Sequence, residues 1–321
     1  MTKAEMRAVS VLAGIFGLRM FGLFLVLPVL ALYADRLAGA TPMLIGLALG
    51  AYGLTQAVLQ IPYGLVSDRL GRKPVIVFGL LVFALGSVVA AAAHTVEWMI
   101  AGRALQGAGA IAAVVLALTA DLTREEQRPK AMALIGMSIG LAFLLALMAG
   151  PLLAGWVGVP GLFWFTAGLA LAAIVLLLGF APTPVQARHH DVQTAPPQIL
   201  NILKHPHLFR LNCGVFFLHL VLTSMFVAVP VALTREVGFA VDSHWQIYVP
   251  VLLLSVATML PLLFLASRKS WMPRVFIGSV AILLAGEVLL VFGFRSFPGL
   301  VVALWVFFWG FNTLEALLPS L

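Results

Sequence analysis

Long apolar runs separated by short polar connections make up most of this sequence. Each run reaches the roughly 20 residues with which an α-helix crosses the hydrocarbon core of a bilayer. The runs lack the strict alternation of apolar and polar residues that barrel strands show, and a helix satisfies its backbone hydrogen bonds within its own segment. The pattern predicts an all-α polytopic protein with ten spans, near residues 10–34, 43–66, 74–94, 97–120, 130–154, 160–181, 208–234, 245–267, 274–294 and 298–321.

The composition narrows the class further. Of the 321 residues, 62% are apolar and 10% are charged, and the mean hydropathy is +1.10, far outside the range of a soluble domain. We therefore expect an integral membrane protein and no enzyme. The first apolar run has no small-residue cleavage site, so we expect it to stay in the mature chain. The single cysteine, Cys213, rules out an internal disulfide.

The basic side chains orient the predicted bundle. Most of the 19 Lys and Arg residues fall in connections on the same side as the amino terminus, and short Lys- and Arg-rich loops stay cytoplasmic. We therefore expect a multi-pass protein of a bacterial-type cytoplasmic (inner) membrane with a cytoplasmic amino terminus. The net charge of +7 then reflects topology and attraction to anionic lipid, and nucleic-acid binding is the poorer interpretation.

The longest polar stretch, residues 182–207, divides a half of six spans, residues 1–181, from a half of four spans, residues 208–321. Its proline and polar content is typical of a cytoplasmic linker. Four histidines raise the alternative of a metal site, but no cysteine or acidic cluster supplies further ligands, so we expect no metal there. These histidines are His189, His190, His205 and His207.

The two halves resemble each other along the chain. FLVLPVLAL at 24–32 aligns with FVAVPVALT at 226–234, and IPYGLVSDRLGRKPVI at 61–76 aligns with LPLLFLASRKSWMPRV at 260–275. A duplication that preserves order and orientation, with an even number of spans in each unit, predicts parallel repeats related by an axis along the membrane normal. The expected architecture is two six-helix halves around a central cavity.

Charge is concentrated in the connection GLVSDRLGRK, residues 64–73. Asp68 and Arg72 lie one helical turn apart, and Gly71 permits a tight turn after them. The connection can thus hold an anion beside a cation at the cytoplasmic rim. The alternative is that these charges only hold topology, for which Arg69 and Lys73 suffice.

This connection, from Gly64 to Lys73, matches the G-x-x-x-D-R-x-G-R-K signature of major facilitator superfamily transporters at every defined position. GRALQGAGA at 102–110 resembles the fourth-helix motif of proton-coupled members. AGPLLAG at 149–155 resembles the fifth-helix motif of antiporters. The opening span, HLVLTSMFVAVP and NTLEALLPSL are similar to the YajR-type drug-efflux branch. The fifth-helix candidates are Gly150, Pro151 and Gly155.

The resemblance covers the whole chain and implies a major-facilitator-like fold of two parallel six-helix repeats. That family has twelve helices, whereas this chain supplies ten, so the second repeat is incomplete. We interpret the end of the chain inside EALLPSL as a truncation, with a natural ten-helix variant as the alternative.

The resemblance also implies a conformational latch at the charged connection. Arg72 is expected to pair with Asp121 at the end of the fourth span, and Asp68 is expected to face the start of an eleventh helix, where the helix dipole stabilises a carboxylate. Such a latch favours the outward-facing state. Ser267 stands in the second half where Asp68 would be, so the latch is one-sided.

Several polar side chains fall inside the predicted spans, where an ionisable group normally faces a cavity or a partner. Arg19 and Glu315 are the strongest functional candidates, because the first and tenth helices line the cavity in the resembling family. We expect this pair to carry the coupling proton. For Arg103, a structural hydrogen bond and a proton relay are equally good interpretations. We expect His219 to be a packing residue, and we expect Glu287 to lie near the interface between membrane and water. The pathway candidates are Arg19, Arg103, Gln106, His219, Glu287, Asn312 and Glu315.

Three classes of function remain. The leading one is a secondary active transporter that exports drug-like or metabolite solutes by proton-coupled alternating access. A solute/proton symporter of the same fold and a non-transporting truncated fragment are the alternatives. The chain has no G-x-x-x-x-G-K-[ST] nucleotide-binding loop, so we expect a proton gradient as the energy source and no cofactor. The expected partners are the lipid bilayer, protons and an amphipathic small molecule, and we expect a monomer.

Overall fold

The computed structural model describes residues 1–182, 206–268 and 270–318. Its contacts divide the chain into two compact units, Met1–Ala187 and Arg188–Leu321, which we call unit 1 and unit 2. Each is described by itself. Nearly all of the predicted linker 182–207 lies outside the described residues, and so do the side chains of its four histidines.

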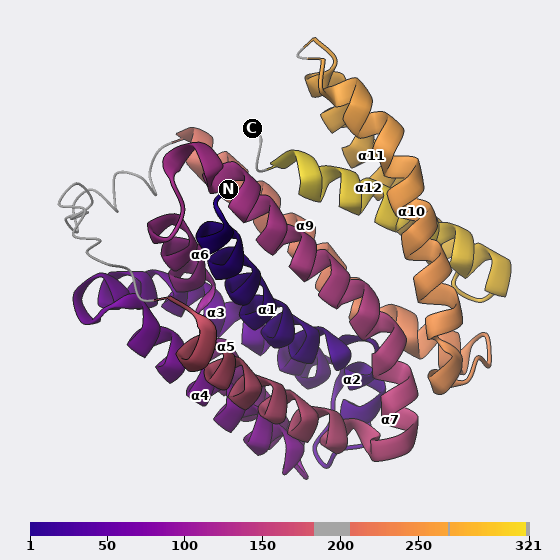
Figure 1. Cartoon of the computed structure of the whole chain (residues 1–321). Coiled ribbons are helices and arrows are strands. Elements are labelled where there is room, and N and C mark those ends of the chain that lie inside the picture. The colour runs from indigo at the N-terminus through magenta and orange to yellow at the C-terminus, as the bar shows by residue number, and fades with distance from the viewer. Residues whose placement is uncertain (183–205, 269, 319–321) are drawn as a thin grey trace. The chain divides into compact units, whose positions relative to one another are not determined.

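Unit 1 is helical throughout its regular structure (Figure 1). Two of the predicted spans contain breaks. The first breaks at Val26, because Pro28 has no amide hydrogen to continue the ladder. The fourth breaks over residues 109–111, where Gly109 leaves the helical conformation. The elements are α1 (Lys3–Leu25), α2 (Leu27–Ala34), α3 (Pro42–Leu70), α4 (Arg72–Ala91), α5 (Val96–Ala108), α6 (Ala112–Asp121), the 3-10 turn η1 (Glu125–Gln127) and α7 (Arg128–Phe180).

Helix α7 has 53 residues, which at 1.5 Å per residue far exceeds a bilayer core of about 30 Å. It contains a break at Gly158, whose φ of 69° and ψ of 171° are outside the helical region. Pro160 lies two residues later, and the ribbon reverses direction at this break within α7 (Figure 1). The element therefore supplies two crossing segments, as the predicted spans 130–154 and 160–181 require.

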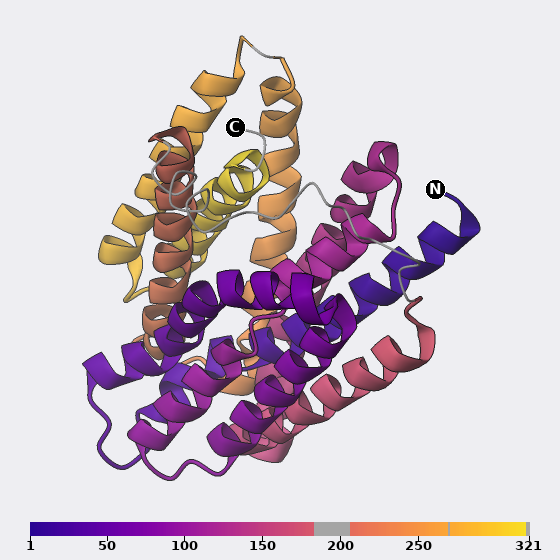
Figure 2. The ribbon, with the colours of Figure 1, turned by 90° about the vertical axis from the view of Figure 1, so that its left-hand side faces the viewer.

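Unit 2 consists of α9 (Pro206–Arg235), the 3-10 turn η3 (Val241–Ser243), α10 (Trp245–Ala266), α11 (Met272–Gly293) and α12 (Phe297–Leu317). Helix α12 lies between α10 and α11, with extensive contacts to both (Figure 2). In the described part of the chain, nine helical stretches are long and apolar enough to cross a membrane, and the longest of them is the one that divides at Gly158. The predicted all-α membrane fold is confirmed.

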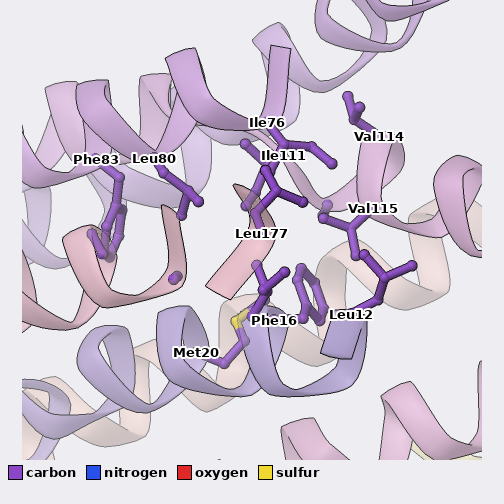
Figure 3. Packing of buried hydrophobic residues seen from close by; sticks show 14 of the residues in the cluster. Leu12, Phe16, Met20, Ile76, Leu80, Phe83, Ile111, Val114, Val115 and Leu177 are labelled. Atoms are coloured by element: carbon purple, nitrogen blue, oxygen red, sulfur yellow. The ribbon is translucent and has the colours of Figure 1, made fainter. Parts of the chain in front are cut away.

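The core of unit 1 forms where α1, α4 and α6 meet the final segment of α7. Phe16, Leu80 and Leu177 are buried there, and their side chains point toward one another (Figure 3). Helices α4 and α5 approach closely through glycines. A Cβ on Gly86 would lie 2.3 Å from the amide nitrogen of Gln106, so the two helices pack at this distance only without a side chain there. This close packing brings Gln106 of α5 within hydrogen-bond distance of Ser87 on α4.

Candidate functional site

The charged connection between α3 and α4 forms a compact cluster around Arg72. Its Nη1 lies 2.5 Å from Oδ1 of Asp68, and its Nε lies 3.1 Å from Oδ2 of Asp121 on α6. Nη1 also donates to Oγ of Ser67 at 2.6 Å, and that hydroxyl donates to the carbonyl of Gly64 at 2.7 Å. The side chain of Asp68 is 44% exposed, whereas that of Asp121 is 15% exposed. The inner carboxylate is therefore the better shielded partner of Arg72.

The backbone of this connection depends on Gly71. Its φ of 92° lies in the left-handed region, which ends α3 and starts α4 one residue later. Lys73 donates from Nζ to the carbonyl of Ala181 at 2.5 Å, so the connection is also tied to the end of α7. Arg69 is exposed. The structure thus brings the predicted pair of Arg72 with Asp121 together, and the latch role itself stays a prediction.

The corresponding place in unit 2 is built differently. Ser267 aligns with Asp68, and its hydroxyl donates to the carbonyl of Phe264 at 2.7 Å. The position that aligns with Arg72 is Trp271, whose ring lies 5.2 Å from the guanidinium of Arg274. Unit 2 therefore has an aromatic contact where unit 1 has a charge cluster.

A second polar cluster lies inside unit 1, around Arg19. This side chain is fully buried. Its Nη2 donates to Oε1 of Gln56 at 2.9 Å and to the carbonyl of Gly109 at 3.1 Å, at the break between α5 and α6. Its guanidinium carbon lies 5.2 Å from the ring of Phe83 and 5.9 Å from that of Tyr52. Nε and Nη1 are buried and have no hydrogen-bond partner among the described residues.

Arg103 lies close to this cluster but is held by different groups. Its Nη1 donates to Oε1 of Gln106 at 2.8 Å, and its guanidinium carbon lies 5.1 Å from the ring of Tyr52. Gln106 in turn donates to Oγ of Ser87 at 2.7 Å. The bond to Gln106 fits the structural alternative for Arg103, and the alternative of a proton relay stays a prediction. Tyr52 links the two arginine groups, because its hydroxyl also donates to Gln56.

The fifth-helix motif packs against the break between α1 and α2. A Cβ on Gly150 would lie 2.3 Å from the carbonyl oxygen of Leu25, so α7 approaches this break only with glycine there. Pro151 is buried beside it, whereas Gly155 is exposed. Gly150 of the motif therefore has a packing role, and the exposed Gly155 does not share it.

In unit 2, two predicted candidates meet. Nε2 of His219 on α9 lies 3.9 Å from Oε1 of Glu315 on α12, and both side chains are about half exposed, at 51% and 50%. The imidazole also contacts the ring of Phe311, with centroids 6.2 Å apart. One turn before Glu315, Asn312 donates to Oγ of Ser255 on α10 at 2.8 Å. The predicted packing role of His219 does not account for its contact with a carboxylate.

Glu287 is half-buried on α11. The expected pairing of Arg19 with Glu315 stays a prediction, because the structure describes each side chain within its own unit. Three residues that contact the arginines or Gln106 were not predicted from the sequence. Gln56 could have been found, because it is a polar residue inside an apolar run. Tyr52 and Ser87 have no comparable feature in the sequence.

A further ion pair ties the amino terminus of α1 to the connection before α7. The carboxylate of Glu5 accepts from Nε of Arg124 at 2.9 Å and from its backbone amide at 3.2 Å. The Glu5 carboxylate raises the pKa of Arg124 above its ordinary value, so this guanidinium stays charged. The two residues are far apart in the sequence, and no local pattern marks them.

Comparison with known proteins places this geometry in a family. The family model described as Major Facilitator Superfamily matches residues 12–321. The chain is 45% identical over 322 aligned residues to the inner membrane transport protein YajR of Escherichia coli (strain K12), with 100% of this chain and 71% of the relative covered. It is 27% identical over 209 residues to the quinolone resistance protein NorA of Staphylococcus aureus, with 63% of this chain and 50% of NorA covered.

The fold also matches solved structures. One is the crystal structure of a bacterial homologue of the human lysosomal transporter Spinster in an inward-facing, unoccupied conformation. The TM-score is 0.78 with 13% sequence identity, and the match covers 100% of this chain and 76% of that structure. At this identity the likeness shows the fold alone.

Proposed function

This chain belongs to the major facilitator superfamily, and on that premise we propose that it exports amphipathic organic solutes by proton-coupled alternating access. The family and fold are those of multi-pass membrane transporters rather than enzymes. The finer proposal includes a location in the bacterial inner membrane with a cytoplasmic amino terminus, a monomeric state, and a proton gradient in place of any cofactor.

The observation that carries the proposal is the contact of His219 with Glu315 at 3.9 Å. Both groups change charge by taking up or releasing a proton, and they come from different helices of unit 2. An ionisable group within a span normally marks an ion or substrate pathway. A carboxylate that releases its proton on one side of the membrane and gains it on the other couples the gradient to a conformational change.

The cluster around Arg72 supports the second part of the proposal, the alternation between two conformational states. It joins α3, α4 and α6 through two carboxylates, and its inner pair with Asp121 is largely shielded. Charge-assisted hydrogen bonds of this kind are worth about 1.5–3 kcal/mol, which is enough to bias a two-state equilibrium by tenfold or more. The aligned residues of unit 2 lack a carboxylate, so this bias acts from one side.

The relatives support the choice of substrate class. YajR is described as an inner membrane transport protein and NorA as a quinolone resistance protein. Aromatic side chains such as Phe217, Trp305 and Phe311 supply apolar surface on α9 and α12, which suits amphipathic solutes.

The test uses proteoliposomes with an imposed pH gradient and two probes, the quinolone norfloxacin and the aromatic cation ethidium. We expect Glu315→Gln to abolish gradient-driven movement of the probe that the wild type transports, while exchange of that probe down its own gradient continues. The matched control is Glu236→Gln, the same substitution at an exposed position between α9 and α10, which should leave both processes intact.

Two outcomes would contradict the proposal. Uphill transport at the wild-type rate in Glu315→Gln would show that Glu315 is a packing residue. Asp121 or Glu287 would then be the residue that carries the proton. Proton flux in the same direction as the solute would identify a symporter.

A further inference from the structure

We propose that the transported solute carries an anionic group, a carboxylate, sulfonate or phosphate, that binds the guanidinium of Arg19 in the middle of unit 1. The inference rests on the proposed transport function and names the chemistry of its substrate. The drug-like class alone does not require this charge, because many amphipathic drugs are neutral or cationic.

The first observation is the incomplete hydrogen bonding of Arg19. Nη2 is occupied by Gln56 and by the carbonyl of Gly109. Nε and Nη1 are buried, and in the part of the chain that the structure describes they have no hydrogen-bond partner. A guanidinium cannot deprotonate to escape this cost, so its free donors need an acceptor in some state of the protein.

The second observation is the charge balance inside unit 1. The Asp and Glu residues among the described residues of this unit lie in connections or in the first or last turn of a helix, none of them in a helix interior. They are Glu5, Asp35, Asp68, Glu97, Asp121, Glu125 and Glu126. The partners of Arg19 are a neutral amide, a carbonyl and two aromatic rings. The missing negative charge must therefore come from outside this interior, and a buried cation without one is costly.

The third observation is depth. Arg19, Gln56 and Gly109 each lie near the middle of a helical stretch that is long enough to cross the membrane, Lys3–Ala34, Pro42–Leu70 and Val96–Asp121 respectively. All three therefore meet at the level of the bilayer centre. Interrupted helices at this level, with free backbone groups and polar side chains, are where transporters hold their solutes.

The chemistry of the free donors selects the ligand. Nη1 lies on the side of Cδ, whereas the hydrogen of Nε lies on the edge shared with Nη2, so the two free donors point in different directions and each offers a charge-assisted hydrogen bond to an oxygen of a carboxylate, sulfonate or phosphate. The rings of Phe83 and Tyr52 lie 5.2 and 5.9 Å from the guanidinium carbon and contribute no negative charge of their own. Arg19 is closed off in this conformation, so the anion meets it in the state that opens this part of unit 1.

The experiment compares two probes with one aromatic body, 2-naphthalenesulfonate and its neutral analogue 2-naphthalenesulfonamide, with inorganic phosphate as a small anionic probe. Binding to the purified protein is measured by calorimetry and by thermal stabilisation. We expect an anion to bind at least about tenfold more tightly than the neutral analogue, as one charge-assisted hydrogen bond of about 1.5–3 kcal/mol predicts.

Variants of Arg19 and of a second arginine test whether the positive charge at Arg19 causes the preference for the anion. Arg19→Gln should remove the preference for the anion, whereas Arg19→Lys should keep part of it because the charge remains. The matched control is Arg36→Gln, which removes the same charge from an exposed connection and should keep the full preference. Binding is repeated in vesicles of neutral phosphatidylcholine and in vesicles that contain phosphatidylglycerol. Loss of probe binding only with the anionic lipid would assign the site to a lipid headgroup and overturn the substrate assignment.

Equal binding of the neutral and anionic probes by the wild type, or an unchanged preference in a folded Arg19→Gln, would also overturn the inference. Arg19 would then be a cap for the broken helix at Gly109. These are equilibrium measurements without a pH gradient, so they can fail while proton-coupled transport is still observed, and the reverse also holds.

Discussion

The two units differ in the kind of charged side chain that their helices carry. In the described residues of unit 1, the buried charges inside the helices are the guanidiniums of Arg19 and Arg103. In unit 2, Glu287 lies inside α11, and Glu315 lies in the last turn of α12 with His219 against it. One unit thus holds buried guanidiniums, and the other holds carboxylates and an imidazole. On the two proposals made above, this difference divides the work, with unit 1 binding an anion and unit 2 carrying the proton.

The charged connections differ in the same one-sided way. Arg72 of unit 1 contacts both Asp68 and Asp121, whereas Ser267 and Trp271 occupy the positions that align with Asp68 and Arg72. Among the described residues of the two aligned connections, only those of unit 1 thus form a charge cluster. Three predictions, from the largest expected effect to the smallest, concern the helix packing of unit 1 and this contrast.

The largest effect is expected from Gly86→Ala in unit 1. The added Cβ would lie 2.3 Å from the amide nitrogen of Gln106 and 2.8 Å from the carbonyl oxygen of Gly102, both of which are backbone atoms. Forcing α4 and α5 apart should cost about 3 kcal/mol and disturb the bond from Gln106 to Ser87. Thermal unfolding in detergent measures the loss. Gly140→Ala is the control, because a Cβ there meets nothing within 4 Å, and an equal loss in both variants would show that local packing is not the cause.

An intermediate effect is expected from the two partners of Arg72. Asp121→Asn removes the more shielded carboxylate and should shift the conformational equilibrium by about 1.5–3 kcal/mol toward inward-facing states. Asp68→Asn should act in the same direction but by about 1 kcal/mol or less, since that carboxylate is 44% exposed.

Cysteine labelling from each side of the membrane measures this shift, after Cys213 has been replaced by Ser. Single reporter cysteines are then compared in the parent and in the two variants. Identical labelling in all three, together with normal transport, would leave the cluster with a topological role only.

The smallest effect is expected from Ser267→Asp, which adds the missing carboxylate to unit 2. The residue one turn later is Trp271 rather than an arginine, so the new carboxylate gains no partner equivalent to Arg72. Labelling and transport should change little. A shift as large as that of Asp121→Asn would show that a carboxylate alone creates the latch.

Much of this organisation could be predicted from local patterns. Hydropathy located the crossing segments, and the spacing of Asp68, Gly71 and Arg72 indicated a charge pair beside a tight turn. The helical spacing of Arg103 and Gln106 likewise indicated a hydrogen bond as one of two alternatives, the other being a proton relay. These features depend on residues close together in the chain or on the average polarity of a run.

The contacts that decide the candidate sites are long-range and escaped prediction. The partners of Arg19 come from α3 and from the break at Gly109, and a hydropathy profile does not show which helices face each other. The break at Gly109 was not predicted, because glycines such as Gly86 also lie inside continuous helices of this chain. His219 was expected to pack and instead lies against Glu315, a partner that only the contact of α9 with α12 reveals.

The division of labour between the units is tested most directly by proton flux in proteoliposomes, recorded with an entrapped pH indicator when 2-naphthalenesulfonate or 2-naphthalenesulfonamide is added. The wild type should move protons more strongly with the anionic probe. Arg19→Gln should respond equally to both probes and still move protons, whereas Glu315→Gln should move none with either and still bind the anion preferentially. Loss of the same property in both variants would contradict separate roles for the cation of unit 1 and the carboxylate of unit 2.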